Sequence, residues 1–321
     1  MNRRDSLRLL GGATALSCLA PGVSLAQSVT RLLVGATPGG GTDIVARALA
    51  QELSARLTRQ FVVENRPGAA GNIAAQAVAK STPDGSTLLL SYTSHVINPS
   101  LYAGRMPFDA VSDFTPLVGI ASLPAILVAR NGLPANHIRE LIAYAQSQPG
   151  KLNLAIAGLG SSNHLAGEML KLDAGIQITS VPYKGTGPAL QDVVAGQIDL
   201  AFSGVASVQQ LLKAGKVKAI AVTSAHRLPD YPQVPAISEV LPGFDFSSWY
   251  GLFGPAGMPT ELADRLALAT REALNTPAMR ERFKSEGLLL MNSQRAEFGQ
   301  FVKSEITRWG KIVNATGVKP E

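Results

Sequence analysis

Residues 31–57 of this chain read RLLVGATPGGGTDIVARALAQELSARL. The apolar run at 31–36 is typical of a buried strand, and apolar residues at 44, 45, 48, 49, 53 and 57 follow one face of a helix. The glycines at 39–41 allow a tight turn between the two elements. A strand, a glycine turn and a helix in this order predict an α/β protein with a largely parallel sheet.

The same alternation continues along the chain. The sequence predicts strands at 61–64, 87–91, 126–129, 152–157, 178–181, 198–202 and 217–223. It predicts helices at 72–80, 137–147, 163–172, 188–195, 205–214, 261–275, 278–286 and 295–316. Trp309 lies on the apolar side of the last helix, so we expect it in the core rather than in a ligand site.

Two apolar stretches punctuated by Pro and Gly, at 117–130 and 247–259, look like crossings between domains. On this interpretation one lobe combines residues 27–125 with 250–321, and residues 126–249 form the other lobe. Two crossings place the lobes on either side of a cleft, and such hinges open and close around a ligand.

The first 26 residues have the features of an export signal. A start that carries three Arg precedes an apolar run at 9–19, and small residues end the segment. We therefore expect cleavage near Ala26 and a periplasmic protein. The pair Arg3-Arg4 resembles a twin-arginine signal, but Ser6 occupies the usual Phe position, so the general secretory and twin-arginine routes both stay open.

The composition excludes several classes of protein. The chain has 321 residues, 46% hydrophobic and 16% charged, with one Cys and a net charge of +6, which excludes disorder, a disulfide scaffold and a zinc ribbon. Cys18 lies in the predicted signal, so the mature chain suits an oxidising compartment. Lys and Arg are scattered without a long run, so we expect no nucleic-acid partner. No apolar stretch after residue 27 reaches the ~18 residues of a membrane span.

Common enzyme signatures are also absent. The chain lacks a G-x-S-x-G elbow, a phosphate-binding G-x-x-x-x-G-K-[ST] loop and an H-E-x-x-H pair. The glycines at 158 and 160 begin like a dinucleotide fingerprint but have no third glycine. We therefore expect no cofactor and no metal.

What remains is a set of loops that end a predicted strand and open a predicted helix. The clearest is 37–43, where Gly39, Gly40 and Gly41 precede a helix that begins at Thr42 or Asp43. Its free N–H groups and the positive end of its dipole favour an anion. The alternative is that Thr42 or Asp43 only caps the helix.

Four further loops hold the same position relative to their strands. They are 158–164 and 182–188, together with the shorter strand ends at 91–95 and 203–204. Ligands of open α/β sheets bind outside the carboxyl ends of the strands, so all five loops are candidates for one site. They contribute the candidates Thr93, Ser94, Gly160, Ser161, Ser162, His164, Lys184, Thr186 and Ser203.

The chain resembles the Bug receptors, the periplasmic substrate-binding components of tripartite tricarboxylate transporters. The stretches that carry the resemblance are PGGGTDIVAR at 38–47, VENRPGAAGNIAA at 63–75, PDGSTLLLS at 83–91, INPSLY at 97–102, GKLNLAIAGLGSSNHLAGEML at 150–170, VPYKGTGPALQDVVAGQIDLAF at 181–202, KAIAVTSAHR at 218–227 and SSWYGLFGPAGMP at 247–259. Together they cover essentially the whole mature chain in order.

The resemblance implies a type II periplasmic-binding-protein fold: two lobes, each with a mainly parallel sheet flanked by helices, and a ligand cleft between them. It implies that the cleft closes on a small organic carboxylate held by backbone N–H groups, hydroxyls and waters. The family's ligand loops fall on 39–43 and 158–164 of this sequence. Family members usually carry an aromatic residue where this chain has Ala36, which enlarges or reshapes the expected pocket and favours a bulkier carboxylate.

The expected function is therefore a receptor, not an enzyme. We expect a monomer that captures a carboxylate and delivers it to the membrane permease subunits of a transporter. Residues 39–42 would donate N–H groups to one carboxylate, Asp43 would orient that loop or accept from the ligand, and Ser161, Ser162 and His164 would hold the other end. Two alternatives remain: a ligand sensor for a membrane signalling partner, and a small-ester hydrolase that uses Ser161 with His164.

Overall fold

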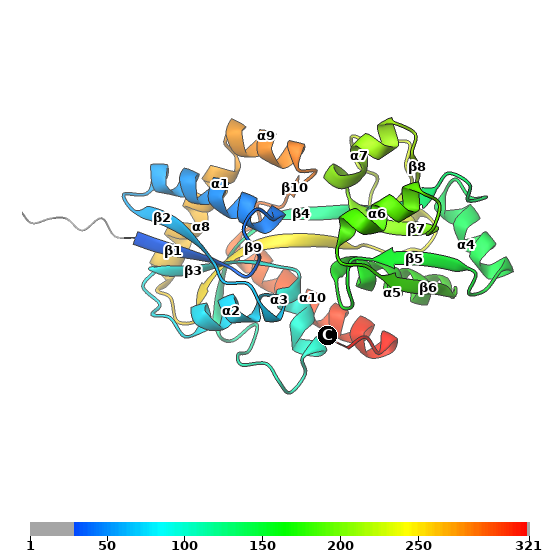
Figure 1. Cartoon of the computed structure of the whole chain (residues 1–321). Coiled ribbons are helices and arrows are strands. Elements are labelled where there is room, and N and C mark those ends of the chain that lie inside the picture. The colour runs from blue at the N-terminus through cyan, green and yellow to red at the C-terminus, as the bar shows by residue number, and fades with distance from the viewer. Residues whose placement is uncertain (1–28, 320–321) are drawn as a thin grey trace, which may run out of the picture.

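The fold consists of two groups of strands. Two long strands through the middle of the molecule join them (Figure 1). The structure is a computed structural model that describes residues 29–319. The predicted export signal, including Cys18, lies outside the described residues.

The first lobe contains the elements predicted around the glycine turn. Strands β1 (Val29–Val34), β2 (Gln60–Asn65) and β3 (Thr87–Tyr92) are parallel, with β1 in the centre. The helices and turns of this lobe are α1 (Gly41–Arg56), η1 (Ala69–Gly71), α2 (Asn72–Ala79), α3 (Ser94–Leu101), α8 (Thr260–Leu274) and α9 (Pro277–Ser285).

The second lobe repeats this arrangement. Strands β5 (Leu152–Ile156), β6 (Ile178–Pro182) and β7 (Leu200–Gly204) are parallel, with β5 between the other two, and β8 (Val217–Val222) lies alongside. The helices and turns are α4 (Ile138–Ser147), α5 (Ser162–Ala174), α6 (Thr186–Val194), α7 (Val205–Lys213) and η2 (Ile237–Glu239). A mainly parallel sheet flanked by helices in each lobe confirms the predicted fold class.

The two predicted crossings are long strands. In β4 (Phe114–Arg130), residues 114–124 pair with β9 (Ser247–Pro255), and residues 125–130 pair antiparallel with β7 and β8 of the second lobe. The Pro and Gly residues of these segments made them look like irregular crossings in the sequence. Register shifts in the pairing of β4 with β9 accommodate these residues within a strand. The strand partners change between Pro124 and Ala125, whereas the lobe boundaries at 125 and 249 stay a prediction.

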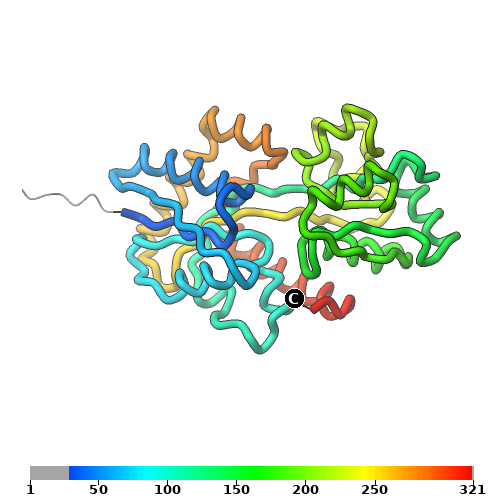
Figure 2. The backbone as a smooth tube through the Cα atoms, in the orientation of Figure 1, coloured from blue at the N-terminus to red at the C-terminus, as the bar shows by residue number. Residues whose placement is uncertain are grey.

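The last helix, α10 (Arg295–Thr316), connects the two lobes on their lower side (Figure 2). It contacts α3 and β4, and it also contacts α5 of the second lobe. Trp309 on this helix is fully buried, as predicted, and its ring meets the Phe246 ring edge-on at a centroid distance of 5.6 Å. One buried apolar cluster accordingly includes residues of both lobes.

Helix α3, strand β9 and the short β10 (Leu289–Leu290) were not predicted, and neither were the single turns η1 and η2. Pro99 lies inside α3, and a proline inside a helix removes one backbone donor, so its sequence does not look helical. Within residues 29–319, no helix is long and apolar enough to cross a membrane.

Candidate functional site

The predicted loops lie at the carboxyl ends of parallel strands in both lobes, where the lobes face each other (Figure 1). Helix α1 opens after β1 in the first lobe, and α5, α6 and α7 open after β5, β6 and β7 in the second. The second-lobe loop at Gly160 comes close to the first lobe, because a Cβ built on Gly160 would lie 3.2 Å from Leu101 Cδ2 at the end of α3. The fold therefore gathers the N-terminal ends of four helices around one interface.

The first loop is held in place by Asp43. The buried carboxylate accepts the Gly39 N–H at 2.9 Å and the Arg47 Nε–H at 2.9 Å on Oδ2, and the Asn65 amide at 2.9 Å on Oδ1. The same Asn65 amide also donates to the Ala36 carbonyl at 3.1 Å. Asp43 is thus the residue that fixes the path of the loop from Ala36 to the start of α1.

These contacts favour the ionised form of the Asp43 carboxyl. The hydrogen bond from Arg47, helped by those from Gly39 and Asn65, outweighs burial and lowers the pKa of Asp43 from 3.8 to about 2. A depressed folded-state pKa contributes stability that is present above the unfolded pKa and is lost as the pH falls towards the folded value.

We therefore expect Asp43→Asn to lower the free energy of unfolding at neutral pH and to flatten its pH dependence between about pH 4 and about pH 2. Urea unfolding of both proteins at a series of pH values in this range measures the difference. Wild-type and Asp43→Asn curves that stay parallel over the range would contradict this role of Asp43.

Three backbone donors of the first loop remain free. The N–H groups of Gly41, Thr42 and Asp43, the first residues of α1, find no hydrogen-bond acceptor among the described residues. The Gly40 N–H donates to the Thr37 carbonyl at 3.3 Å. Gly39 and Gly40 correct the prediction, because the N–H groups that we expected to bind a ligand are occupied by Asp43 and by the Thr37 carbonyl.

Two tyrosines that the sequence analysis did not select lie beside this loop. Tyr92 and Tyr250 face each other on the paired strands β3 and β9. A Cβ on Gly41 would lie 2.9 Å from the Tyr250 hydroxyl, and a Cβ on Gly71 would lie 3.1 Å from the Tyr92 hydroxyl. Burial raises the pKa of both phenols, so both hydroxyls stay protonated at neutral pH.

The backbone at 68–71 is the second missed part of the first lobe. A Cβ on Gly35 would come within 2.6 Å of the Gly71 Cα, so this loop contacts the end of β1 directly. Residues 69 and 70 both adopt positive φ angles, and the Asn98 side chain donates to the Ala70 carbonyl at 3.1 Å. Its sequence, Pro-Gly-Ala-Ala-Gly after a predicted strand, carries the same signal as the loops that were selected.

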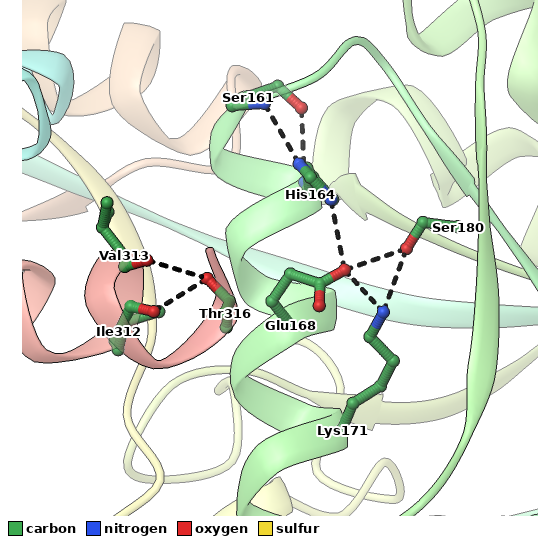
Figure 3. A network of polar contacts seen from close by, with 9 residues as sticks. Ser161, His164, Glu168, Lys171, Ser180, Ile312, Val313 and Thr316 are labelled. Carbon is green, nitrogen blue, oxygen red and sulfur yellow. Dashed lines mark hydrogen bonds and ion pairs between the residues drawn. The ribbon is translucent and has the colours of Figure 1, made fainter. Parts of the chain in front are cut away.

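The second loop, 158–161, is organised by Ser161 and His164 at the start of α5 (Figure 3). Ser161 Oγ accepts the His164 N–H at 3.2 Å, and His164 Nδ1 accepts the Gly160 N–H at 3.0 Å. His164 Nε2 lies 3.1 Å from Glu168 Oε1. The prediction that His164 holds the ligand directly needs correction, since both ring nitrogens have protein partners and the residue is buried.

The same contacts argue against the hydrolase alternative. A serine nucleophile needs a histidine ring nitrogen as its base. Here Ser161 Oγ bonds to the backbone of His164, and the ring nitrogens serve Gly160 and Glu168. The free donors of this loop are instead the N–H groups of Ser162 and Asn163, for which no acceptor is found within the described part of the chain.

The remaining candidates occupy different environments. Ser94 is half-buried and opens α3, Thr186 is half-buried and opens α6, and Lys184 is exposed. Thr93 is a correction: it is buried and its Oγ1 accepts the Trp249 N–H at 2.8 Å, so it joins β3 to β9. Ser203 is fully buried and its Oγ has no partner among residues 29–319.

The largest cavity described lies elsewhere. It has a volume of about 710 Å³ and is lined by α8, α10 and the segment around Val111, with Phe114, Phe253 and Arg271 among its residues. None of the candidate residues lines it. The described residues contain no group of three His, Cys, Asp or Glu side chains that could hold a metal ion.

Comparison with known proteins gives one family. The family described as "Tripartite tricarboxylate transporter family receptor" (TctC) matches residues 45–318. A solved structure from R. palustris with adipate is 34% identical, covers 92% of this chain and 99% of its own, and has a TM-score of 0.77. MatC from Rhodopseudomonas palustris with bound malate is 34% identical over 89% of this chain and 99% of its own, with a TM-score of 0.73. The periplasmic binding protein BugD is 33% identical over 91% of this chain and 99% of its own, with a TM-score of 0.74.

Proposed function

Because the chain belongs to the tripartite tricarboxylate transporter receptor family, TctC, we propose that it captures a small organic carboxylate between its two lobes and delivers it to membrane permease subunits. The family consists of solute-binding receptors rather than enzymes. Two relatives with one-third identity were solved with adipate and malate, which are both dicarboxylates. A dicarboxylate is accordingly the first ligand class to test.

The observation that carries the proposal is the set of free N–H groups at the start of α1. Helix α1 has 16 residues, and the N–H groups of Gly41, Thr42 and Asp43 have no acceptor in the described part of the chain. Such a helix end binds a carboxylate through direct hydrogen bonds and through its dipole. The starts of α5, α6 and α7 lie opposite, so a second carboxylate of the same ligand would find donors on the other lobe.

The candidate residues divide into those that would contact the ligand and those that shape the loops. Gly40 leaves room for the ligand at the first loop, and Ser162 offers its N–H and hydroxyl from the second. The remaining members of the proposed site are Ala36, Gly39, Gly41, Thr42, Asp43, Ser94, Gly160, Ser161, His164, Lys184, Thr186 and Ser203, with Thr93 supporting the strands. Gly39, Asp43 and His164 act by shaping the loops, and the Tyr250 hydroxyl joins the donors, whereas the Tyr92 hydroxyl donates to the Gly35 carbonyl at 3.4 Å.

Ala36 bears on the size of the ligand. Its side chain is half-buried and lies at the end of β1, beside the first loop. A ring at this position would fill space that alanine leaves open, so we propose that this receptor accepts longer or bulkier carboxylates than malate. Ala36→Phe is expected to shift the preference towards shorter acids in a series of dicarboxylates of increasing chain length.

The cellular setting follows from the family. Members such as BugD are periplasmic binding proteins, and we propose that this chain is exported through its N-terminal segment, cleaved near Ala26, and works in the periplasm as a monomer. Residues 27–125 with 250–321 and residues 126–249 would form the two lobes that close on the ligand.

A thermal-shift screen of the purified protein against organic acids tests the proposal. A ligand at 100 times its dissociation constant stabilises the folded state by about 2.7 kcal/mol. For a chain of this size we expect an upward shift of the melting temperature of roughly 4 °C. Neutral sugars of similar size serve as controls. A shift with sugars and none with any carboxylate would contradict the proposed ligand class.

A further inference from the structure

The His164 ring connects the second ligand loop to the body of the second lobe (Figure 3). Nδ1 accepts a hydrogen bond from the Gly160 N–H, so this nitrogen carries a lone pair. In a neutral ring the proton is then on Nε2, which donates to Glu168 Oε1 at 3.1 Å. The geometry therefore assigns one tautomer to the ring.

Glu168 is itself fixed by two further contacts. Its Oε1 lies 2.5 Å from Lys171 Nζ, and it accepts the Ser180 hydroxyl of β6 at 3.0 Å. Burial opposes ionisation of this carboxyl, but the hydrogen bonds from His164, Lys171 and Ser180 outweigh it and lower the pKa of Glu168 from 4.5 to about 2. The ring is thus anchored on a carboxylate that is tied to two elements of the lobe.

The loop that the ring holds turns at Gly160. Gly160 has a φ of +71°, a backbone conformation that L side chains rarely adopt. The loop is closed by the bond from the Ser161 N–H to the Gly158 carbonyl at 3.2 Å and by the bond from Gly160 to His164. These two bonds set the direction of the free N–H groups of Ser162 and Asn163.

We propose that His164 is a positioning residue of the ligand site: its neutral ring holds the loop 158–161 in the binding geometry, and protonation of Nδ1 releases the loop and weakens ligand binding. This inference rests on the proposed function. Protonation turns Nδ1 from an acceptor into a donor, so the Gly160 N–H then faces another N–H. One hydrogen bond is lost and two donors are left opposed.

Some charged groups around the His164 ring favour its protonated form, and others oppose it. Glu168 on α5 favours the protonated ring, and Lys171 on the same helix opposes it. The segment after α10 lies beside Leu159, His164 and Glu168, and its Lys319 is an exposed second cation there. Ser180 on β6 contributes a hydroxyl, and Leu101 on α3 contributes only apolar atoms. Glu168 is therefore the group that promotes release on acidification.

Two matched substitutions of His164 test its contact with Gly160 and its contact with Glu168 separately. In His164→Asn the amide oxygen can take the place of Nδ1 and accept from Gly160, whereas the side chain is too short for Glu168. In His164→Gln the amide reaches the position of Nε2 and Glu168, and the acceptor beside Gly160 is lost. A residue with a merely structural role would not distinguish these two variants.

The first measurement is independent of any ligand. Amide hydrogen exchange of Gly160, expressed as protection relative to the unstructured rate at the same pH, reports the bond to Nδ1. We expect protection to fall about tenfold when wild-type protein is moved from about pH 8 to about pH 5, the range over which histidines ordinarily change charge. We expect it to be low at both pH values in His164→Gln and to be restored and independent of pH in His164→Asn. Equal protection in all three proteins overturns the inference.

The second measurement is the affinity for adipate by calorimetry at the same two pH values. We expect His164→Gln to bind about tenfold more weakly than wild type at the higher pH, and His164→Asn to bind within about threefold. At the lower pH, protonation of adipate itself weakens binding to both proteins, so wild-type affinity should fall about tenfold more than that of His164→Asn. Binding that is equal in all variants overturns the role of His164, whereas wild-type protein that binds no carboxylate at either pH contradicts the proposed function and leaves the exchange result to decide the role in the loop.

Discussion

Replacement of Gly40 by valine is expected to weaken carboxylate binding by about 100-fold or more while the protein stays folded. The backbone of Gly40 has φ −76° and ψ 164°, which any residue adopts. A Cβ there makes only an ordinary contact, 3.4 Å to the Thr37 carbonyl oxygen. The branched side chain would stand directly before the free N–H groups at the start of α1. Loss of two hydrogen bonds to a carboxylate, each worth about 1.5–3 kcal/mol, gives the expected factor.

Two controls sharpen this prediction. Gly40→Ala adds a single methyl group and should weaken binding less than valine. Gly132→Val makes the same change at an exposed glycine of the second lobe, beyond the far end of β4, where the added Cβ meets only the end of the Arg130 side chain. We expect this control to bind within about twofold of wild type. Titration calorimetry and melting curves of all four proteins provide the test, and undiminished binding by Gly40→Val would remove the first loop from the site.

Replacement of Trp309 by alanine is expected to produce the largest loss of stability. The indole is fully buried, meets Phe246 edge-on and donates from Nε1 to Glu305 Oε2 at 3.0 Å. Truncation of such a side chain costs about 3–5 kcal/mol, because it leaves a cavity and an unpaired buried carboxylate oxygen. For a chain of this size the melting temperature should fall by roughly 5–8 °C.

The variant Trp309→Phe keeps a ring and loses the N–H, so we expect a smaller fall than with alanine. Lys303→Ala, an exposed change on the same helix, should alter the free energy of unfolding by less than about 0.5 kcal/mol. Calorimetric melting of the three variants beside wild type measures the differences. If Trp309→Ala has the same melting temperature as wild type, α10 does not stabilise the contact between the lobes.

The elements with strong hydrophobic periodicity could be predicted closely. The helix predicted at 295–316 is observed at Arg295–Thr316, and the helix predicted to begin at Thr42 or Asp43 is observed at Gly41–Arg56. The long strands β4 and β9 could not be recognised as such, because Pro and Gly within them mask the strand pattern. Pairing of β4 with β7 and with β9, far away in the chain, makes these segments strands, and the local sequence does not show it.

The position of the candidate loops at the ends of strands was predictable, but the contacts of several of their side chains were not. The rule that ligands lie outside the carboxyl ends of strands selects the loops at Gly39 and Gly160. The contacts that fix these loops come from residues far apart in the sequence, such as Asn65 on Asp43. Thr93 likewise looks like an exposed loop hydroxyl in the sequence, whereas in the fold it accepts a hydrogen bond from the Trp249 N–H, 156 residues away.

The most direct test of carboxylate capture between the lobes is titration calorimetry with adipate and with its neutral diamide. The two molecules have the same carbon chain and differ in charge at both ends. If free N–H groups and helix dipoles recognise the ligand, adipate should bind one molecule per chain, and the diamide should bind about 100-fold more weakly or not at all. Equal affinity for the acid and the diamide would contradict the account.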